Sequence, residues 1–222
     1  MSAAPPAADP TPRSRAEFVV RDLGRRPLEP VWAEMRAFTE ARSAETRDEI
    51  WFVEHPPVFT LGLNADRSHL IAPGDVPVVQ IDRGGQVTYH GPGQVVAYVL
   101  ADIRRLNLNV RTLVQALESA VVDTVAAYGI DAQPRRDAPG VYVGGRKLAA
   151  IGLRLRRYCS YHGLALNVAM DLSPFRRIHP CGYADLEVTQ IADLCDVNDP
   201  ERVRRDLEPH LVRRLTAFAA GP

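Results

Sequence analysis

An α+β domain, with a mixed or antiparallel sheet flanked by helices, is the fold class that the sequence predicts. Strand-like stretches gather between the main amphipathic helical stretches, and strands and helices do not alternate regularly along the chain. A chain of 222 residues also has ample material for one large hydrophobic core. We therefore expect residues 17–222 to form a single domain behind a disordered tail over residues 1–16, which is rich in Ala and Pro.

The first half of the chain is expected to supply one helix and most of the strands. Val31, Met35 and Phe38 recur near helical spacing, which predicts a helix over 28–42. The polar stretch 64–77 contains Asn, Asp, Pro and Gly and predicts a surface loop. Strands are expected at 18–21, as a sheet edge, and at 49–54, 58–63, 78–82 and 94–100.

The second half contains the strongest helical pattern. Leu113, Leu117 and Val121 lie on one apolar stripe of residues 110–128, and Gly129 suits the position after a helix end. We expect this helix to face the core and to carry no chemistry of its own. A closing helix is expected over 200–218, and strands over 130–133, 140–143, 146–157 and 161–168.

Composition excludes several classes of protein. Equal numbers of basic and acidic residues, 27 of each, leave no overall positive field for nucleic acid. No apolar run approaches the roughly 20 residues that span a bilayer. Three cysteines at irregular spacing do not resemble a disulfide framework, and the first fifteen residues lack the apolar core of a secretory signal. A reducing, cytoplasmic setting is therefore expected.

Lys147 is the only lysine among the 27 basic residues. Glycines and apolar residues surround it over residues 140–152. An arginine is always protonated, whereas an ammonium can lose its proton when it is buried or placed near other charges. We therefore take Lys147 as a candidate proton-transfer group, with chance retention on a solvated hairpin as the alternative.

A Gly-rich segment spans residues 83–94 and holds four glycines. Glycines remove side chains from a turn and let the backbone approach a ligand closely. The segment is not a phosphate-binding loop, because no Gly-Lys-Ser/Thr follows and no dinucleotide fingerprint opens a helix. The alternative is a Gly-rich hairpin with a hydrogen-bonded histidine, although a plain hairpin needs only one or two glycines.

Cys181 lies between Pro180 and Gly182, a setting typical of a nucleophile on a loop. Cys159 and Cys195 are interpreted as small buried hydrophobic residues. Zinc binding by Cys159, His162, His179 and Cys181 is disfavoured, because the spacing fits structural zinc sites poorly. A Cys–His dyad, with His90, His162 or His179 as the base, stays open.

Four blocks of the sequence together resemble the lipoyl(octanoyl) transferase family. They read RGGQVTYHGPGQ at 83–94, GRKLAAIG at 145–152, HGLALN at 162–167 and PCG at 180–182, in the family's order. The resemblance implies a fold like that of biotin and lipoate protein ligases. It also implies transfer of an octanoyl group from octanoyl-acyl carrier protein, through a cysteine thioester, to a lysine of a lipoyl domain.

The resemblance also implies roles for individual residues. Cys181 would be the acyl-thioester nucleophile, and Lys147 would stabilise its thiolate. No metal or other cofactor is implied. The expected protein partners are the carrier protein, lipoyl domains of 2-oxoacid dehydrogenase complexes and the glycine-cleavage H protein, with the enzyme itself a monomer. The substrate pocket would be lined by Arg83, Gly84, Gly85, Gln86, Val87, Thr88, Tyr89, His90, Ala150, Ile151, Gly152, Gly163, Leu164 and Ala165.

Two other functions stay open at this point. An ATP-dependent lipoate or biotin ligase of the same fold would activate a free acid and need no cysteine nucleophile, so the Pro-Cys-Gly loop speaks against it. A non-catalytic module could bind an acyl group in the same pocket and would show binding without turnover.

Overall fold

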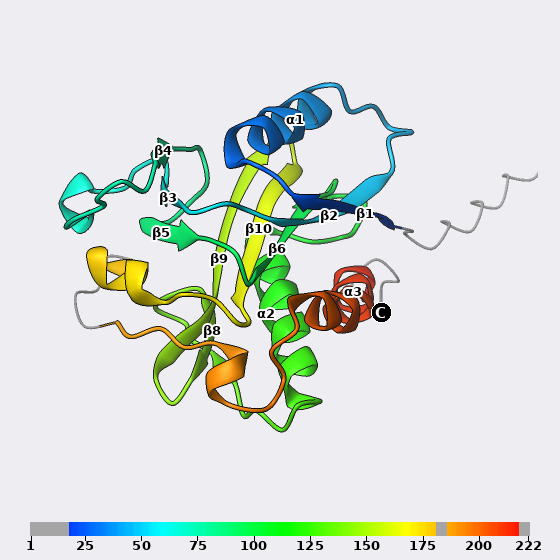
Figure 1. Cartoon of the computed structure of the whole chain (residues 1–222). Coiled ribbons are helices and arrows are strands. Elements are labelled where there is room, and N and C mark those ends of the chain that lie inside the picture. The colour runs from blue at the N-terminus through cyan, green and yellow to red at the C-terminus, as the bar shows by residue number, and fades with distance from the viewer. Residues whose placement is uncertain (1–17, 181–185, 218–222) are drawn as a thin grey trace, which may run out of the picture.

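The computed structural model describes residues 18–180 and 186–217 and shows a large mixed sheet with helices on both faces (Figure 1). Helix α1 (Leu28–Glu40) covers one face, and helices α2 (Val110–Ala126) and α3 (Pro200–Thr216) cover the other. The tail predicted over residues 1–16 lies outside the described residues. None of the described helices is long and apolar enough to cross a membrane.

The large sheet confirms the predicted α+β class with a mixed sheet. Its first two strands run parallel, and every later neighbour pair is antiparallel. In spatial order, the strands described are β1 (Phe18–Arg25), β2 (Asp48–Glu54), β6 (Gln94–Leu100), β10 (Cys159–Asn167), β9 (Arg146–Arg156), β8 (Gly140–Val143) and β7 (Gln133–Pro134).

A second, three-stranded sheet carries the Gly-rich segment. Strand β3 (Val58–Leu61) lies in its centre, parallel to β4 (Val78–Gln80) and antiparallel to β5 (Val87–His90). The sequence analysis did not anticipate β5 as a strand, because the surrounding glycines predicted a turn. The segment therefore turns twice and contributes a short strand between the turns.

Side-chain alternation along the central strands builds two separate cores. Ile50 and Phe52 of β2 pack with α2 and α3, whereas Trp51 and Val53 pack against α1. Strand β6 divides its residues in the same way. Successive side chains of a strand point to opposite faces, so an apolar run without alternation indicates a strand buried on both sides.

The strand predicted over 130–133 is wrong for most of its length. Gly129 has φ of 76°, and its backbone N–H donates to the Ala126 carbonyl, while the N–H of Ile130 donates to the Val125 carbonyl. Ile130 and Ala132 lie beyond the helix end at Ala126 and are buried in the same core as α2. Their apolar character therefore reflects packing after a helix terminus, and pairing begins only at Gln133.

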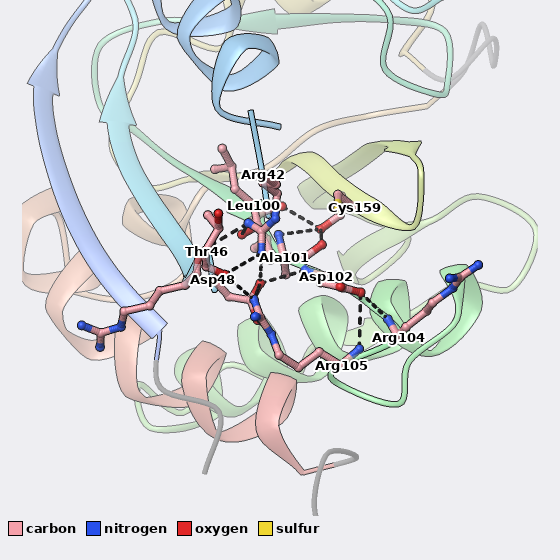
Figure 2. A network of polar contacts seen from close by, with 12 residues as sticks. Arg42, Thr46, Asp48, Leu100, Ala101, Asp102, Arg104, Arg105 and Cys159 are labelled. Atoms are coloured by element: carbon pink, nitrogen blue, oxygen red, sulfur yellow. Dashed lines mark hydrogen bonds and ion pairs between the residues drawn. The ribbon is translucent and has the colours of Figure 1, made fainter. Parts of the chain in front are cut away.

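Asp48 organises a buried ionic cluster at one end of the large sheet, far along the chain from the Gly-rich segment. Figure 2 shows Arg42 and Arg105 directed at its carboxylate, with N–O distances of 2.5 and 2.7 Å. The backbone N–H of Asp102 donates to the same carboxylate over 2.8 Å. The cluster ties the segment after α1 to the segment that follows β6.

Candidate active site

A cavity lies between the α1 face of the large sheet and the small sheet. The space between its walls, counted together with its open mouth, is about 750 Å³. The Gly-rich segment, β9 and β10 contribute most of its wall. Of the residues predicted for a substrate pocket, those in the wall are Arg83, Gly85, Gln86, Val87, Thr88, His90, Ala150, Ile151, Gly152, Gly163, Leu164 and Ala165.

Gly84 and Tyr89 are not part of this wall. The backbone N–H of Gly84 donates to the Leu153 carbonyl over 2.9 Å, so Gly84 joins the Gly-rich segment to β9. The Tyr89 ring packs against Phe59 and Phe175, with centroids 5.3 and 5.6 Å away. Thr88 and His90 line the cavity, whereas the ring of Tyr89, which lies between them, packs against these two phenylalanines.

Lys147 lies in the cavity wall, near the start of β9. Its side chain is 4% exposed, which excludes the solvated hairpin considered from the sequence. Its Nζ donates to the Pro139 carbonyl over 3.2 Å and lies 5.3 Å from the centre of the Tyr142 ring. The fold therefore places the lone lysine in a largely apolar setting.

The chain returns to Lys147 after residue 185. The backbone N–H of Lys147 donates to the Glu187 carbonyl over 2.8 Å, and the N–H of Thr189 donates to the Lys147 carbonyl over 2.9 Å. Pro180 and Val188 both line the cavity. Cys181 lies outside the described residues, but the described residues on either side of its segment border the same cavity as Lys147.

Two histidines in the wall are held neutral. His90 Nδ1 lies 2.8 Å from Gln94 Oε1, and burial, with a smaller effect of the His55 charge, lowers the pKa of His90 to about 3. Burial also lowers the pKa of His162, although His162 Nε2 lies 2.9 Å from the Asp82 carboxylate. Both imidazoles are therefore uncharged near neutral pH, and neighbouring side chains fix their orientation.

The Asp82 carboxylate links the Gly-rich segment to its surroundings. It accepts hydrogen bonds from Trp32 Nε1 and from the hydroxyl of Tyr161, and it contacts His162. These hydrogen bonds outweigh the effect of burial and lower its pKa. Because Asp82 directly precedes Arg83, this network holds the start of the Gly-rich segment against β10 and α1.

Arg83 and Gly152 make the close contact between the Gly-rich segment and β9. The Arg83 guanidinium donates to the Thr60 carbonyl over 2.7 Å and to the Thr60 hydroxyl over 2.9 Å. A Cβ atom at position 152 would lie 3.0 Å from the Gly84 carbonyl oxygen and 3.1 Å from Arg83 Cδ. A glycine at 152 therefore lets the two walls approach.

The structure adds polar residues that the sequence analysis did not single out. Tyr98 and Asn167 line the cavity. The Tyr98 hydroxyl lies 2.8 Å from His55 Nε2, and Asn167 Nδ2 donates to the Thr189 carbonyl over 3.0 Å. These polar atoms have protein partners, so the wall can accept an apolar ligand. The sequence signal that could have identified these residues was a polar side chain within a mostly apolar strand.

The described residues contain no group of three or more His, Cys, Asp or Glu side chains that could hold a metal ion. Cys159 is buried, which raises the pKa of its thiol, and its Sγ donates to the Arg157 carbonyl. His162 is engaged with Asp82. Cys195 is half-buried. For Cys159, this burial fits the interpretation as an inert packing residue.

The fold is that of the catalytic domains of lipoate and biotin protein ligases. Protein Ta0514 of T. acidophilum with bound lipoic acid matches with a TM-score of 0.73 and 17% identity, covering 90% of this chain and 86% of that one. Lipoate-protein ligase A bound with ATP matches with a TM-score of 0.71 and 15% identity, covering 90% and 85%. Biotin protein ligase from Aquifex aeolicus matches with a TM-score of 0.54 and 11% identity, covering 93% and 72%.

Sequence comparison identifies the family within this fold. The model of the lipoyl protein ligase A/B catalytic domain matches residues 27–212. Octanoyltransferase of Pseudomonas entomophila is 58% identical over 196 residues, 88% of this chain and 91% of that protein. Octanoyltransferase of Klebsiella pneumoniae subsp. pneumoniae is 55% identical over 206 residues, 93% and 94% of the two chains. The chain therefore belongs to the octanoyltransferases of the lipoyl protein ligase A/B catalytic family, enzymes of octanoyl transfer in protein lipoylation.

Proposed function

We propose that this enzyme takes its octanoyl group from the phosphopantetheine thioester of acyl carrier protein, carries it on Cys181 and delivers it to a lysine of a lipoyl domain. The proposal depends most on one observation. Lys147, the only lysine in the chain, is buried in the wall of a cavity that Pro180 and Val188 also line. A cysteine on the segment between these two residues is a natural partner for that ammonium group.

The first half-reaction forms the acyl-enzyme. The Lys147 ammonium stabilises the thiolate of Cys181, which attacks the carbonyl carbon of the donor thioester. The bond between that carbon and the pantetheine sulfur breaks as the new carbon–sulfur bond to Cys181 forms. The leaving sulfur takes a proton from Lys147, so carrier protein departs as a thiol and Lys147 is left as a neutral amine.

The second half-reaction restores both groups. The amine of the target lysine attacks the Cys181 thioester and forms an amide, and the Cys181 thiolate leaves. Lys147 accepts the proton that the attacking nitrogen loses and becomes an ammonium again. An arginine could stabilise the thiolate but could not exchange this proton, which explains a lysine at this position. The scheme predicts ping-pong kinetics.

The cavity supports this chemistry through its wall. Ile151, Leu164 and Val96 offer apolar surface to an alkyl chain, and the glycines leave width for it. Exclusion of water from such a slot protects a thioester from hydrolysis. The scheme needs no metal or other cofactor, since the activated acyl group arrives on the carrier protein.

Mass spectrometry of the intact protein tests the proposal. Incubation with octanoyl-acyl carrier protein should add one octanoyl group, and peptide mapping should place it on Cys181. Cys181→Ser should form no thioester adduct and transfer nothing. Cys159→Ala is the matched control, because Cys159 is buried away from the cavity wall, and it should form the adduct normally. An adduct mapped to Cys159 or Cys195 would refute the assignment.

Two alternatives make different predictions in the same assay. An ATP-dependent ligase would act on free octanoate with ATP and ignore the carrier-protein thioester; the ligase structures similar to this chain support only the shared fold at their low identity. A binding module would retain the octanoyl carrier protein without a covalent adduct.

The acceptor is proposed to be a lipoyl domain. One similar structure, at 17% identity, is of a bi-partite lipoate protein ligase and its E2 lipoyl domain from Thermoplasma acidophilum, and octanoyltransferase relatives act in lipoylation. Transfer to lipoyl domains of 2-oxoacid dehydrogenases and to the glycine-cleavage H protein stays a prediction, as do a single domain over residues 17–222, a monomeric state and a cytoplasmic location.

A further inference from the structure

Glu118 is a buried carboxylate on the helix that was expected to carry no chemistry. Its side chain is 6% exposed and lies on the core side of α2. Its Oε1 accepts a hydrogen bond from the backbone N–H of Gly140 over 3.0 Å. Among the described residues it has no arginine partner, unlike the buried Asp48. A buried carboxylate needs a reason to be retained, because burial disfavours its charged form.

A single peptide group connects Glu118 to Lys147. The N–H of Gly140 and the carbonyl of Pro139 belong to the same planar peptide unit and point in opposite directions. Glu118 accepts from the N–H, and Lys147 Nζ donates to the carbonyl over 3.2 Å. The negative carboxylate, the peptide dipole and the ammonium are thus aligned, and hydrogen bonds in such a series strengthen one another.

The surroundings of Gly140 leave no room for another residue in this linkage. Gly140 has φ of 141°, in the region that favours glycine. A Cβ atom there would lie 2.5 Å from the Ala149 carbonyl oxygen and 2.9 Å from Lys147 Cε. The peptide unit is therefore clamped between α2 and the lysine side chain, and its position sets the position of the ammonium group.

We propose that Glu118 is a positioning residue that, through the Pro139–Gly140 peptide, aims the Lys147 ammonium into the cavity and stabilises its charged form. The inference rests on the proposed function, because it assigns Lys147 the proton transfers described above. It also gives the second helix a task in the reaction besides packing.

Electrostatics agree with this geometry. Burial raises the pKa of Glu118, while the Gly140 N–H and the positive charge of Lys147 both act to lower it. Other polar or charged groups near the lysine are Tyr142 of β8, Arg135, which also contacts the Tyr142 ring, and the backbone carbonyl of Glu187. In the described part of the chain, Glu118 is an acidic side chain whose charge interacts with that of Lys147.

Glu118→Gln separates the charge from the hydrogen bond. The amide oxygen can still accept from Gly140, so the fold should persist, and loss of a desolvated charge should leave the melting temperature equal or higher. We expect acyl-enzyme formation from octanoyl-pantetheine, measured by rapid-quench mass spectrometry, to slow by about tenfold. Without the carboxylate charge, the positive charge of the ammonium group is less stabilised, so the alkaline limb of the pH–rate profile should move to lower pH.

Two further variants keep the test decisive. Glu118→Asp retains the charge and should return the alkaline limb toward the wild-type position, even if the shorter side chain lowers the rate. Glu49→Gln is the matched control: Glu49 is a buried carboxylate that pairs with Arg21 and Trp51, so its loss should reduce stability and leave the pH–rate profile unchanged.

The possible outcomes separate the two proposals. Wild-type rate and an unmoved alkaline limb in Glu118→Gln would overturn the role of Glu118, as would a Glu118→Asp profile equal to that of Glu118→Gln. If the wild-type protein forms no adduct on Cys181, the proposed function itself fails. An adduct with an unchanged Glu118→Gln profile leaves the function intact and removes only the inference.

Discussion

Two buried carboxylates in this protein have opposite surroundings. Asp48 accepts hydrogen bonds from two arginines and from the backbone N–H of Asp102, and both of its oxygens are used (Figure 2). Within the described residues, Glu118 accepts one hydrogen bond, from Gly140, and burial raises its pKa. The first arrangement neutralises its charge locally. The second leaves the carboxylate charge available to act on Lys147 across a peptide group.

The hydrogen-bond donors around a buried carboxylate indicate whether the group serves stability or activity. A carboxylate with a full set of donors stabilises the chain segments that supply them, and its removal leaves charges without a partner. A carboxylate with one donor and a raised pKa is a cost to folding at neutral pH, and such sites concentrate where chemistry needs them. Asp48 is thus expected to matter for stability, and Glu118 for activity.

The largest expected effect tests the Asp48 side of the comparison. Asp48→Ala leaves Arg42, whose side chain is 4% exposed, without its carboxylate, and should lower the free energy of unfolding by about 3–5 kcal/mol. Glu34→Ala removes an exposed pair with Arg26 and should cost about 0–1 kcal/mol. Urea unfolding measures both. If Asp48→Ala folds and transfers octanoyl groups at the normal rate, Asp48 serves stability alone, as expected. A variant that folds but is inactive would contradict this assignment.

The next effect tests the Lys147 side. Lys147→Arg keeps the positive charge but removes the exchangeable proton, so the transfer rate should fall by about 100-fold, or roughly 2.7 kcal/mol in activation free energy. Single-turnover kinetics with octanoyl-acyl carrier protein provide the measurement. Arg146→Lys, at the half-buried neighbouring position, should stay near the wild-type rate. Near-normal turnover in Lys147→Arg would remove the proton-transfer role.

The smallest expected effect is on the pH dependence of stability and comes from His90 in the cavity wall. The pKa of His90 in the folded protein is about 3, below the unfolded value of about 6.5. As pH falls below about 6.5, the unfolded chain binds a proton that the folded protein does not, so stability declines, by at most about 1.4 kcal/mol per pH unit for this histidine.

Unfolding free energies measured between pH 7 and 4.5 check the prediction. His90→Gln should show a shallower acid decline than the wild-type protein, because the group that binds the extra proton in the unfolded state is gone. Equal slopes in the two proteins would show that His90 binds its proton over the same pH range in the folded and unfolded states, which would contradict the prediction.

Several parts of this structure followed from local patterns. The helical stripe of residues 110–128 predicted α2, and strand-like stretches at 49–54 and 94–100 predicted central strands β2 and β6. The glycine content of residues 83–94 indicated a close backbone approach to a ligand, and this segment lines the cavity, as Lys147 does. The role of Lys147 in proton transfer stays a prediction. These features succeed because spacing along a helix or strand, and the chemistry of a residue type, are properties of the local chain.

Other parts depended on contacts between distant segments. Glu118 lies three residues before Val121 on the apolar stripe. The sequence therefore placed an acidic residue at a core position but did not indicate its role. Tyr89 was predicted to line the pocket because its motif is there, but its ring packs against Phe59 and Phe175 instead. The strand at β5 was hidden by the glycines that flank it.

The sequence by itself determined the α+β class, the main elements and the presence of one lysine suited to proton exchange. The tertiary structure alone decided which groups surround that lysine: the Pro139 carbonyl, Gly140 and, through them, Glu118. The physical reason is that periodicity specifies which face of an element is buried, whereas the pairing of a carboxylate with an ammonium group depends on how elements more than twenty residues apart in the chain pack together.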